Sequence, residues 1–157
     1  MRKRISSQEP QNASAADQGW LDLQRLAQVE LTSEDSAYPI EAALSVSVGS
    51  GWRAAQAGKQ TIRLLFDESQ RVRRIQLLFH EDRNPRTQEF VLRWSPDGGR
   101  SYREIVRQQY NFSPSGMTRE FEDYTVDLPG VTTIELTIVP DISGGDACAS
   151  ITQLRVA

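Results

Sequence analysis

The residues of this chain best suited to ligand chemistry lie in a short polar run around its single histidine. His80 is followed by Arg83 and Arg86 in the sequence HEDRNPR. Arginine presents fixed, paired N–H donors, which suit the oxygen atoms of a polar ligand. The run therefore predicts a hydrogen-bonding site. The competing interpretation is an ordinary surface loop in which Glu81 or Asp82 forms local ion pairs with the arginines.

A second candidate segment combines aromatic and amide side chains in the sequence QQYNFSP. Tyr110, Asn111 and Phe112 offer ring faces for C–H surfaces and amides for hydroxyl groups, the usual components of a sugar-binding surface. The alternative is that the two aromatic rings fill an edge of the fold. Asp141, which is soon followed by a Gly-Gly pair, can act as an acceptor beside a nest of backbone N–H groups, although a plain turn explains the same pattern.

Signatures of catalysis are absent from the sequence. It contains no G-x-S-x-G elbow, H-E-x-x-H motif, P-loop or C-x-x-C pair. Cys148 is the only cysteine and lies between two alanines, which favours a buried, inert thiol. One histidine and dispersed carboxylates do not make a zinc or iron site. The sequence therefore predicts a protein without enzymatic activity.

Composition restricts the partners of the chain. Its 157 residues, net charge of −3 and isoelectric point near 5.2 suit one domain and argue against nucleic-acid binding through a basic surface. No apolar run approaches the roughly 20 residues that span a bilayer. Residues 1–18 start with basic residues but contain no hydrophobic segment, so we expect a flexible tail, no signal peptide and a cytoplasmic location. Residues 19–157 form the predicted domain.

The clearest structural pattern is a hairpin at 87–107. Phe90, Leu92 and Trp94 recur at the two-residue period of a half-buried strand. The sequence SPDGG then supplies residues that accept the backbone angles of a turn. Arginines that alternate with apolar residues, such as Arg93, are typical of a solvated sheet face on which their stems cover apolar surface.

Short strands separated by turns fill most of the remaining sequence. Alternation predicts a strand at 44–48 and further strands on both sides of turns at 67–69 and 129–130. Segment 108–114 is interpreted as a loop, and Trp52 as a core anchor. Eight or nine short strands with almost no helical period predict an all-β, antiparallel β-sandwich.

The hairpin sequence TQEFVLRWSPDGGRSYREIV resembles the strand–turn–strand hallmark of discoidin domains, also called coagulation factor V/VIII (F5/8) type C domains. The resemblance covers about residues 26–157. It implies a galactose-binding-like jelly-roll sandwich of about eight strands, whose loops at one end bind carbohydrates, phospholipid head groups or proteins. Supporting matches occur in the family's order at 51–53, 72–77, 131–136 and 151–156.

The resemblance also implies roles for the candidate residues. Sugar-binding members place a histidine and arginines in the loop that starts at His80, and the polarity of this loop argues against the apolar membrane contacts of the clotting members. Calcium-binding members use carboxylates in an early loop, where Glu34 and Asp35 are the candidates for a structural calcium. No other cofactor is expected.

The predicted function is noncatalytic, lectin-like carbohydrate binding by a free-standing module of bacterial type. The alternative is an intracellular protein-interaction domain of the same fold. The ligand, the oligomeric state and the union of the 80–86 and 108–114 segments in one site are left open. The predicted ligand-binding residues are His80, Arg83, Arg86, Tyr110, Asn111, Phe112 and Asp141.

Overall fold

The computed structural model describes residues 19–45 and 47–157, so the predicted tail at 1–18 lies outside the described residues. Within these ranges the chain forms eight strands and two single-turn helices, which confirms the predicted all-β fold. Neither helix in this part of the chain has the length and apolar character needed to cross a membrane. In chain order the elements are α1 (Leu23–Leu26), β1 (Ala27–Leu31), α2 (Glu41–Leu44), β2 (Trp52–Ala57), β3 (Gln60–His80), β4 (Arg86–Ser95), β5 (Arg103–Phe112), β6 (Arg119–Val139), β7 (Cys148–Ile151) and β8 (Gln153–Val156).

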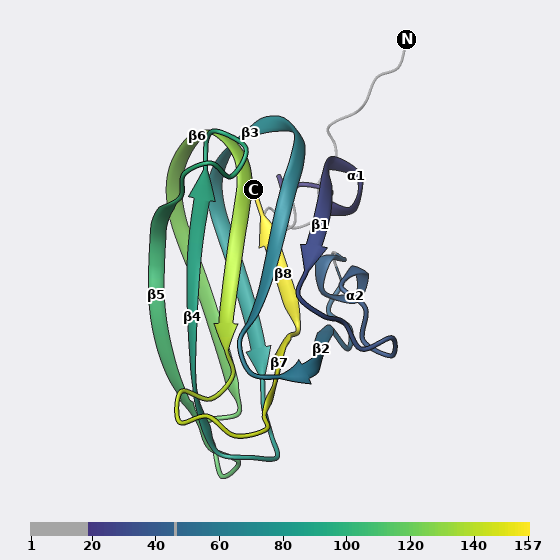
Figure 1. The fold of residues 1–157 in the computed structure, drawn as a ribbon, viewed down its shortest axis with the longest axis vertical. Helices are drawn as coiled ribbons and strands as arrows, with labels where there is room; N and C mark the ends of the chain where they lie inside the picture. Colours follow the sequence, from purple (N-terminus) through teal and green to yellow (C-terminus); the bar gives the residue numbers. More distant parts are fainter. Residues whose placement is uncertain (1–18, 46) are drawn as a thin grey trace, which may run out of the picture.

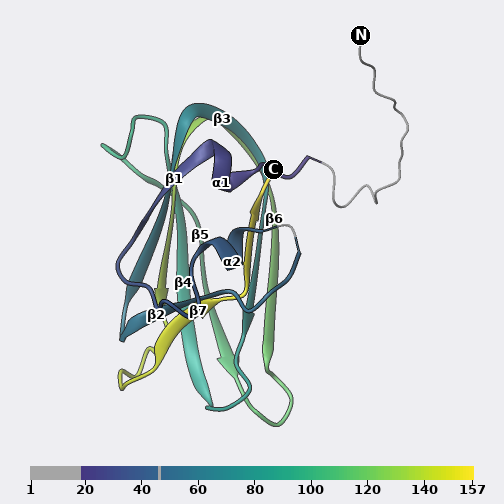
Figure 2. The ribbon, with the colours of Figure 1, turned by 90° about the vertical axis from the view of Figure 1, so that its right-hand side faces the viewer.

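Two long strands, β3 and β6, organise the sandwich. Each has 21 residues, and they pair antiparallel from Gln60 opposite Ile138 to His80 opposite Arg119. Register shifts interrupt the pairing in the middle of both strands. Figures 1 and 2 show the strands arching over one end of the molecule. The two halves of this pair therefore contribute to two facing layers.

The remaining strands extend these layers. The hydrogen-bonded order is β1-β3-β6-β4-β5, and β8 joins the second half of β3 at Ile75–Leu78. Strands β2 and β7 form a separate small sheet away from the arch. All pairs of named strands are antiparallel. The architecture is the predicted antiparallel sandwich.

The core lies between the two layers. Alternate residues of the long strands point inward, as Ile62 does in the first half of β3 and Ile75 in the second half, and both are almost fully buried. Phe79 of β3 stacks on Phe90 of β4, with ring centroids 5.3 Å apart. The two-residue periodicity of the sequence thus identified the core-facing side chains, and burial of this apolar surface is the main source of stability.

The predicted hairpin joins β4 to β5, and its turn is closed by its own side chains. The Ser95 hydroxyl donates to Asp97 Oδ1 at 2.7 Å and accepts the Gly99 N–H at 2.9 Å. A hydrogen bond from the Ser101 hydroxyl is the main cause of the lowered pKa of Asp97. Gly98 and Gly99 have positive φ, as the SPDGG sequence predicts. Thr132 of β6 also holds the turn, because its hydroxyl accepts the Gly98 N–H and donates to the carbonyl oxygen of Ser95.

Two local predictions are wrong. The described residues of the predicted strand at 44–48 form no strand, because Leu44 ends α2 and residues 45, 47 and 48 are irregular. The segments 67–69 and 129–130 do not separate strands, because β3 and β6 continue through them, with Gly130 at φ +64°. Polar residues, proline and glycine here mark irregular pairing where the strands bend. A local pattern does not distinguish such a bend from a turn.

Trp52 is buried, as predicted, and the backbone beside it depends on glycine. The indole N–H of Trp52 donates to the carbonyl oxygen of Ser33. Trp52 pairs with Ile151 of β7, and this brings the β7 backbone against Gly51. A Cβ atom at Gly51 would lie 2.4 Å from the carbonyl oxygen of Ile151. Only glycine allows this approach.

Substitution of Gly51 by alanine tests the close approach. Gly51→Ala and Gly58→Ala both place a side chain at positive φ, +79° and +89°, which costs about 1–2 kcal/mol. Only Gly51→Ala also drives Cβ into the β7 backbone, and overpacking adds about 1–3 kcal/mol. Urea denaturation should therefore show the larger loss of unfolding free energy for Gly51→Ala. Equal losses would contradict the steric explanation.

Candidate functional site

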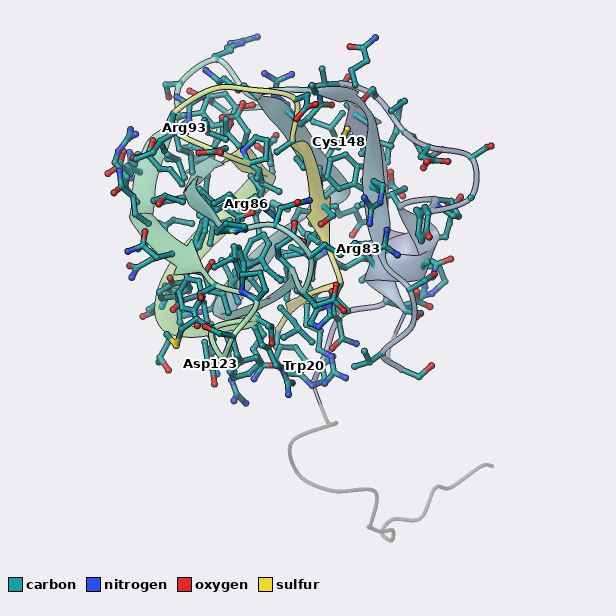
Figure 3. The ribbon with its side chains drawn as sticks, turned by 90° about the horizontal axis from the view of Figure 1, so that it is seen from below. Trp20, Arg83, Arg86, Arg93, Asp123 and Cys148 are labelled. Carbon is teal, nitrogen blue, oxygen red and sulfur yellow. The ribbon has the colours of Figure 1, made fainter. Side chains whose placement is uncertain are left out.

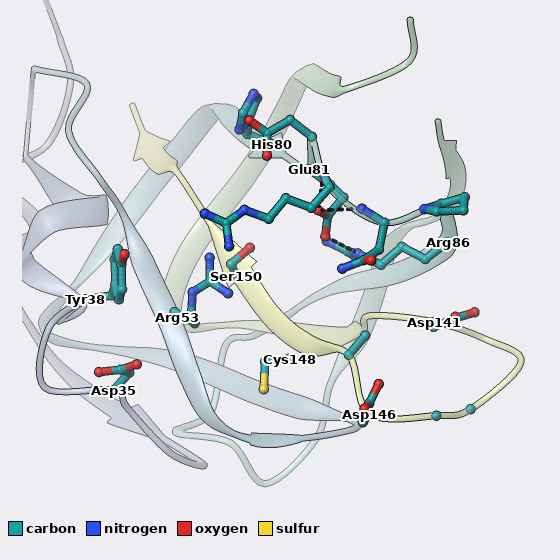
Figure 4. Close-up of a pocket in the computed structure, with 17 residues that line it drawn as sticks. Asp35, Tyr38, Arg53, His80, Glu81, Arg86, Asp141, Asp146, Cys148 and Ser150 are labelled. Carbon is teal, nitrogen blue, oxygen red and sulfur yellow. Dashed lines mark hydrogen bonds and ion pairs between the residues drawn. The ribbon is translucent and has the colours of Figure 1, made fainter. Parts of the chain in front are cut away.

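A cleft of about 890 Å³ opens at the end of the sandwich opposite the arch. Its lining comes from the loop between β1 and β2, from residues 80–86 between β3 and β4, and from the loop between β6 and β7. Arg53 of β2 and Ser150 of β7 complete it. Figure 3 views this end of the molecule, and Figure 4 shows the lining side chains. Three connections that are distant in sequence therefore converge on one cleft.

Arg86 anchors the 80–86 loop. It is only 7% exposed, and its Nε donates to Glu81 Oε1 at 2.9 Å. Its Nη1 donates to the carbonyl oxygen of Pro140 at 2.6 Å and to Gln88 Oε1 at 3.3 Å. The guanidinium carbon lies 4.8 Å from the ring centre of Phe112. Arg86 borders the cleft, but its Nε donor is used by Glu81, and its Nη1 donor is used by Gln88 and by Pro140, which follows β6.

Glu81 holds the loop from the other side of this ion pair. Its Oε2 accepts the backbone N–H groups of Arg83 and Asn84 at 2.9 Å and 3.2 Å. Partial burial raises the pKa of Glu81, but hydrogen bonds from Arg86 and from the two N–H groups outweigh that effect, so the pKa lies below its ordinary value. Glu81 is therefore a carboxylate at neutral pH, and it fixes the backbone beside the cleft.

Two arginines of the cleft have no carboxylate partner in the described part of the chain. Arg53 and Arg83 both line the cleft and are exposed, and neither takes part in an ion pair between described residues. The guanidinium of Arg53 lies over the ring of Tyr38, 5.1 Å from its centre. His80 also lines the cleft and is exposed. The groups left available to a ligand include several strong donors.

The second predicted segment is mostly strand. The sequence predicts a loop at 108–114, but β5 extends to Phe112, which pairs across the ladder with Arg86. The loop prediction fails because pairing with β4 continues beyond the apolar part of the hairpin. Amide-rich sequences carry no strong strand signal, so this extension was not visible locally.

None of the three residues predicted in that segment lines the cleft. Phe112 is buried beneath Arg86, and the Tyr110 ring meets it edge to face at 5.0 Å. The Tyr110 hydroxyl donates to the carbonyl oxygen of Arg119, and Asn111 Oδ1 accepts the Thr87 hydroxyl. The alternative interpretation, that the aromatic rings fill the sandwich edge, describes this arrangement. The 80–86 and 108–114 segments do not share the cleft.

The predicted acidic residues mainly cap turns. Asp141 lines the cleft, but it accepts hydrogen bonds from the hydroxyl and the N–H of Ser143, and these lower its pKa. Glu34 and Asp35 each accept a backbone N–H of the turn that follows them. Among the residues that the structure describes, no group of three or more His, Cys, Asp or Glu side chains is placed to hold a metal ion. A structural calcium at Glu34 and Asp35 stays a prediction.

Sequence reasoning missed several residues of the cleft. Tyr38 and Arg53 reach it because the Asp35 N–H donates to the Arg53 carbonyl and the Arg53 N–H donates to the Tyr38 carbonyl, which fastens the early loop along β2. No local motif announces this long-range pairing. Asp146 also lines the cleft and was not predicted, although it directly follows the Gly-Gly pair. Cys148, expected to be buried, is partly exposed and lines the cleft.

No protein-family model matches the sequence, and no curated protein matches it. Solved structures nevertheless share its fold. The family 32 carbohydrate-binding module of NanJ from C. perfringens, in complex with galactose, is 15% identical, with a TM-score of 0.64 over 87% of this chain and 96% of that chain. A second module from Clostridium perfringens, in complex with GalNAc-β-1,3-galactose, is 16% identical, with a TM-score of 0.59 over 87% and 98% of the two chains.

An F5/8 type C domain from Bacteroides fragilis is 12% identical, with a TM-score of 0.59 over 87% of this chain and 93% of that chain. These neighbours span almost the whole described domain. The chain therefore has the galactose-binding-like fold of discoidin, or F5/8 type C, domains, and this confirms the fold implied by the sequence resemblance. At these identities the similarity establishes architecture and leaves the site to be argued from its own residues.

The anchoring role of Arg86 predicts a large effect on stability. Arg86→Ala leaves the Glu81 carboxylate and the Pro140 carbonyl without this donor, and we expect the free energy of unfolding to fall by about 3 kcal/mol. Arg107→Ala is the matched control, because Arg107 forms exposed ion pairs and its loss should cost less than about 1 kcal/mol. Urea denaturation measures both. A loss for Arg86→Ala as small as that of the control would contradict the anchoring role.

Proposed function

We propose that this chain is a noncatalytic module that binds carbohydrate in the cleft at the end of the sandwich. The observation that carries the proposal is the presence of Arg53 and Arg83 on the lining without carboxylate partners in the described part of the chain. Elsewhere on the sandwich, Arg63, Arg74 and Arg93 bind neighbouring carboxylates. Unpaired guanidinium groups in a concave site are free to donate hydrogen bonds to ligand oxygens.

The cleft suits a ligand that both donates and accepts hydrogen bonds. Its volume of about 890 Å³ lies within the usual range for small-molecule sites, roughly 300–1,000 Å³. Arg53 and Arg83 supply donors, and the exposed carboxylates of Asp82 and Asp146 supply acceptors on the same lining. A sugar hydroxyl uses both kinds of partner. Tyr38 adds an aromatic ring, although Arg53 covers one part of it.

The structural neighbours support carbohydrate as the ligand class. The NanJ module is in complex with galactose, and the second module is in complex with a galactose-containing disaccharide. The shared fold is the basis of the analogy with these sugar-binding modules, and the polar cleft is the candidate binding site in this chain. Sugars that carry a carboxylate are also candidate ligands, because the guanidinium groups of the unpaired arginines match a carboxylate in geometry.

Two carboxylates of the cleft, Glu81 and Asp141, lack a property that glycoside hydrolysis needs. A glycosidase needs a general acid whose pKa is raised. The pKa values of Glu81 and Asp141 are instead lowered: burial raises that of Glu81, but Arg86 and backbone hydrogen bonds overcome it, and bonds from Ser143 lower that of Asp141. Neither residue therefore has the raised pKa of such an acid, and our proposal is binding without turnover.

A glycan array followed by calorimetry tests the proposal. The array should carry galactose, galactose-containing disaccharides and acidic glycans, and the best ligand should then be titrated against variants. A hydrogen bond from a charged donor is worth about 1.5–3 kcal/mol, so Arg53→Ala and Arg83→Ala should each weaken binding by roughly 10- to 100-fold. Chemical shifts in the 80–86 and 141–147 loops should change on binding.

Asn111→Ala is the matched control, because Asn111 belonged to the predicted site but does not line the cleft. Its affinity should stay within a factor of about two of the parent value. An array without binding, together with stoichiometric capture of a protein that depends on the same arginines, would replace carbohydrate binding with the alternative of a protein-interaction domain. Shifts confined to β5 would place the site elsewhere.

A further inference from the structure

The inward faces of the sandwich change from apolar to polar near the cleft. Along β4, the core residues Phe90 and Leu92 are preceded on the same face by Gln88 and Arg86, and all four are buried. Opposite them, the first inward residue of β6 is Glu120, which is 1% exposed and pairs across the ladder with core residue Phe79. A carboxyl group at such a position is costly unless it is neutral or hydrogen-bonded.

An unbroken series of hydrogen bonds connects this buried carboxyl group to the cleft. Gln88 Nε2 donates to Glu120 Oε1 at 3.2 Å, and Arg86 Nη1 donates to Gln88 Oε1 at 3.3 Å. Arg86 Nε then donates to Glu81 at 2.9 Å, and Glu81 accepts the N–H of Arg83 on the cleft lining. Each member restricts the orientation of the next.

The surroundings of Glu120 favour its protonated form. Burial is the main effect that raises its pKa to about 8, and the neighbouring Glu122 carboxylate adds to it. The hydrogen bond from Gln88 and the positive charge of Arg86 act in the opposite direction. Glu120 Oε2 has no hydrogen-bond partner within the described structure. At neutral pH the carboxyl group is therefore mainly uncharged.

The elements around Glu120 contribute few other charges. On β6 itself, Tyr124 follows Glu122 on the inward face, and its hydroxyl is also buried without a hydrogen-bond partner in the described structure. From β4 the charged group is Arg86, and from β3 the neighbour is Phe79. On β5, the Tyr110 hydroxyl donates to the carbonyl oxygen of Arg119, the first residue of β6. Arg86 is thus the cation to which an ionised Glu120 would be drawn.

We propose that Glu120 is a positioning residue of the cleft: uncharged, it leaves Arg86 bound to Glu81, and ionised, it draws Arg86 inward and releases the 80–86 loop. The relevance of this coupling to ligand binding rests on the proposed function of the cleft. Release of Glu81 would also weaken its hold on the N–H groups of Arg83 and Asn84. One of the two unpaired arginines would then lose its fixed backbone.

The coupling is measurable without any ligand by ¹³C NMR of the glutamate carboxyl carbons between pH 5 and 10. Because the pKa of Glu81 lies below its ordinary value, its own titration is centred below this range. We expect its carboxyl carbon to shift nonetheless, with the same midpoint as Glu120, because Arg86 moves away from it. Glu120→Gln should abolish the shift of Glu81. A flat Glu81 signal in the parent protein, or an unchanged shift in Glu120→Gln, would overturn the proposal.

Two further variants separate positioning from a general effect of pH. Gln88→Met removes the intermediate amide and keeps both carboxyl groups, so Glu120 should still titrate while Glu81 no longer follows it. His80→Asn removes the histidine of the cleft and should leave the midpoint of Glu81 unchanged. A midpoint that moves with His80→Asn would assign the effect to the histidine instead.

Stability provides an independent measurement. Because the folded-state pKa of Glu120 is raised above its unfolded value, its contribution to stability is fully present below the ordinary glutamate pKa of about 4.3 and is lost as pH rises through about 8. Glu120→Gln lacks this titration, so its stability relative to the parent should increase over that interval and then level off. A difference that is independent of pH would show that Glu120 does not titrate as proposed.

Ligand binding completes the test. With the best glycan from the array, affinity should fall about fivefold or more between pH 6.5 and 9 in the parent protein, the lower end of typical coupling between sites, and should not fall in Glu120→Gln. Binding that does not vary with pH while Glu81 responds would overturn the link to the ligand. Failure to bind any glycan would instead reject the proposed function, and the NMR result would stand independently.

Discussion

The antiparallel pairing of β3 with β6 is the constraint on which the rest of the structure depends. The pair runs from Gln60 and Ile138 to His80 and Arg119, and its arch links the two layers (Figures 1 and 2). Every other strand of the main sheet attaches to this pair directly or through β4. At the end opposite the arch, residues 80–86 follow β3 and the loop to β7 follows β6, and both line the cleft. The cleft is a consequence of this topology.

Arg63 and Arg93 of the sheet surface form ion pairs across the strands, whereas Arg53 and Arg83 of the cleft form none with described residues. Arg63 and Arg93 both donate to Glu135, which is 2% exposed beneath them, and Arg93 also lies over the ring of Tyr102. These two arginines of the sheet surface are thus used internally, as expected for a solvated face with covering stems. Arg53 lies outside this network, on the small sheet beside the cleft.

Sequence patterns predicted the parts of the fold that repeat locally. The alternation of Phe90 with Leu92 and the SPDGG turn fixed the hairpin, because apolar periodicity and turn chemistry are properties of neighbouring residues. His80 and Tyr110 were predicted as ligand-binding residues from segment composition and the resemblance; the structure brings His80 to the cleft and packs Tyr110 against Phe112. The extension of β5 depends on its partner strand, and the approach of Arg53 depends on β2 meeting a loop that precedes it. Pairings between segments that are distant in the sequence cannot be predicted from the residues of one short segment.

The polar interior near the cleft shows why burial and function are hard to separate in this molecule. The alternation that points Phe79 into the core also points its partner Glu120 there, so simple periodicity would place an apolar residue at 120. A glutamate is tolerated because Gln88 and Arg86 continue the polar character to the surface. Replacing all three with apolar residues would remove the cost of desolvation. It would also remove the anchor of Glu81, and with it the fixed wall that presents Arg83 to a ligand.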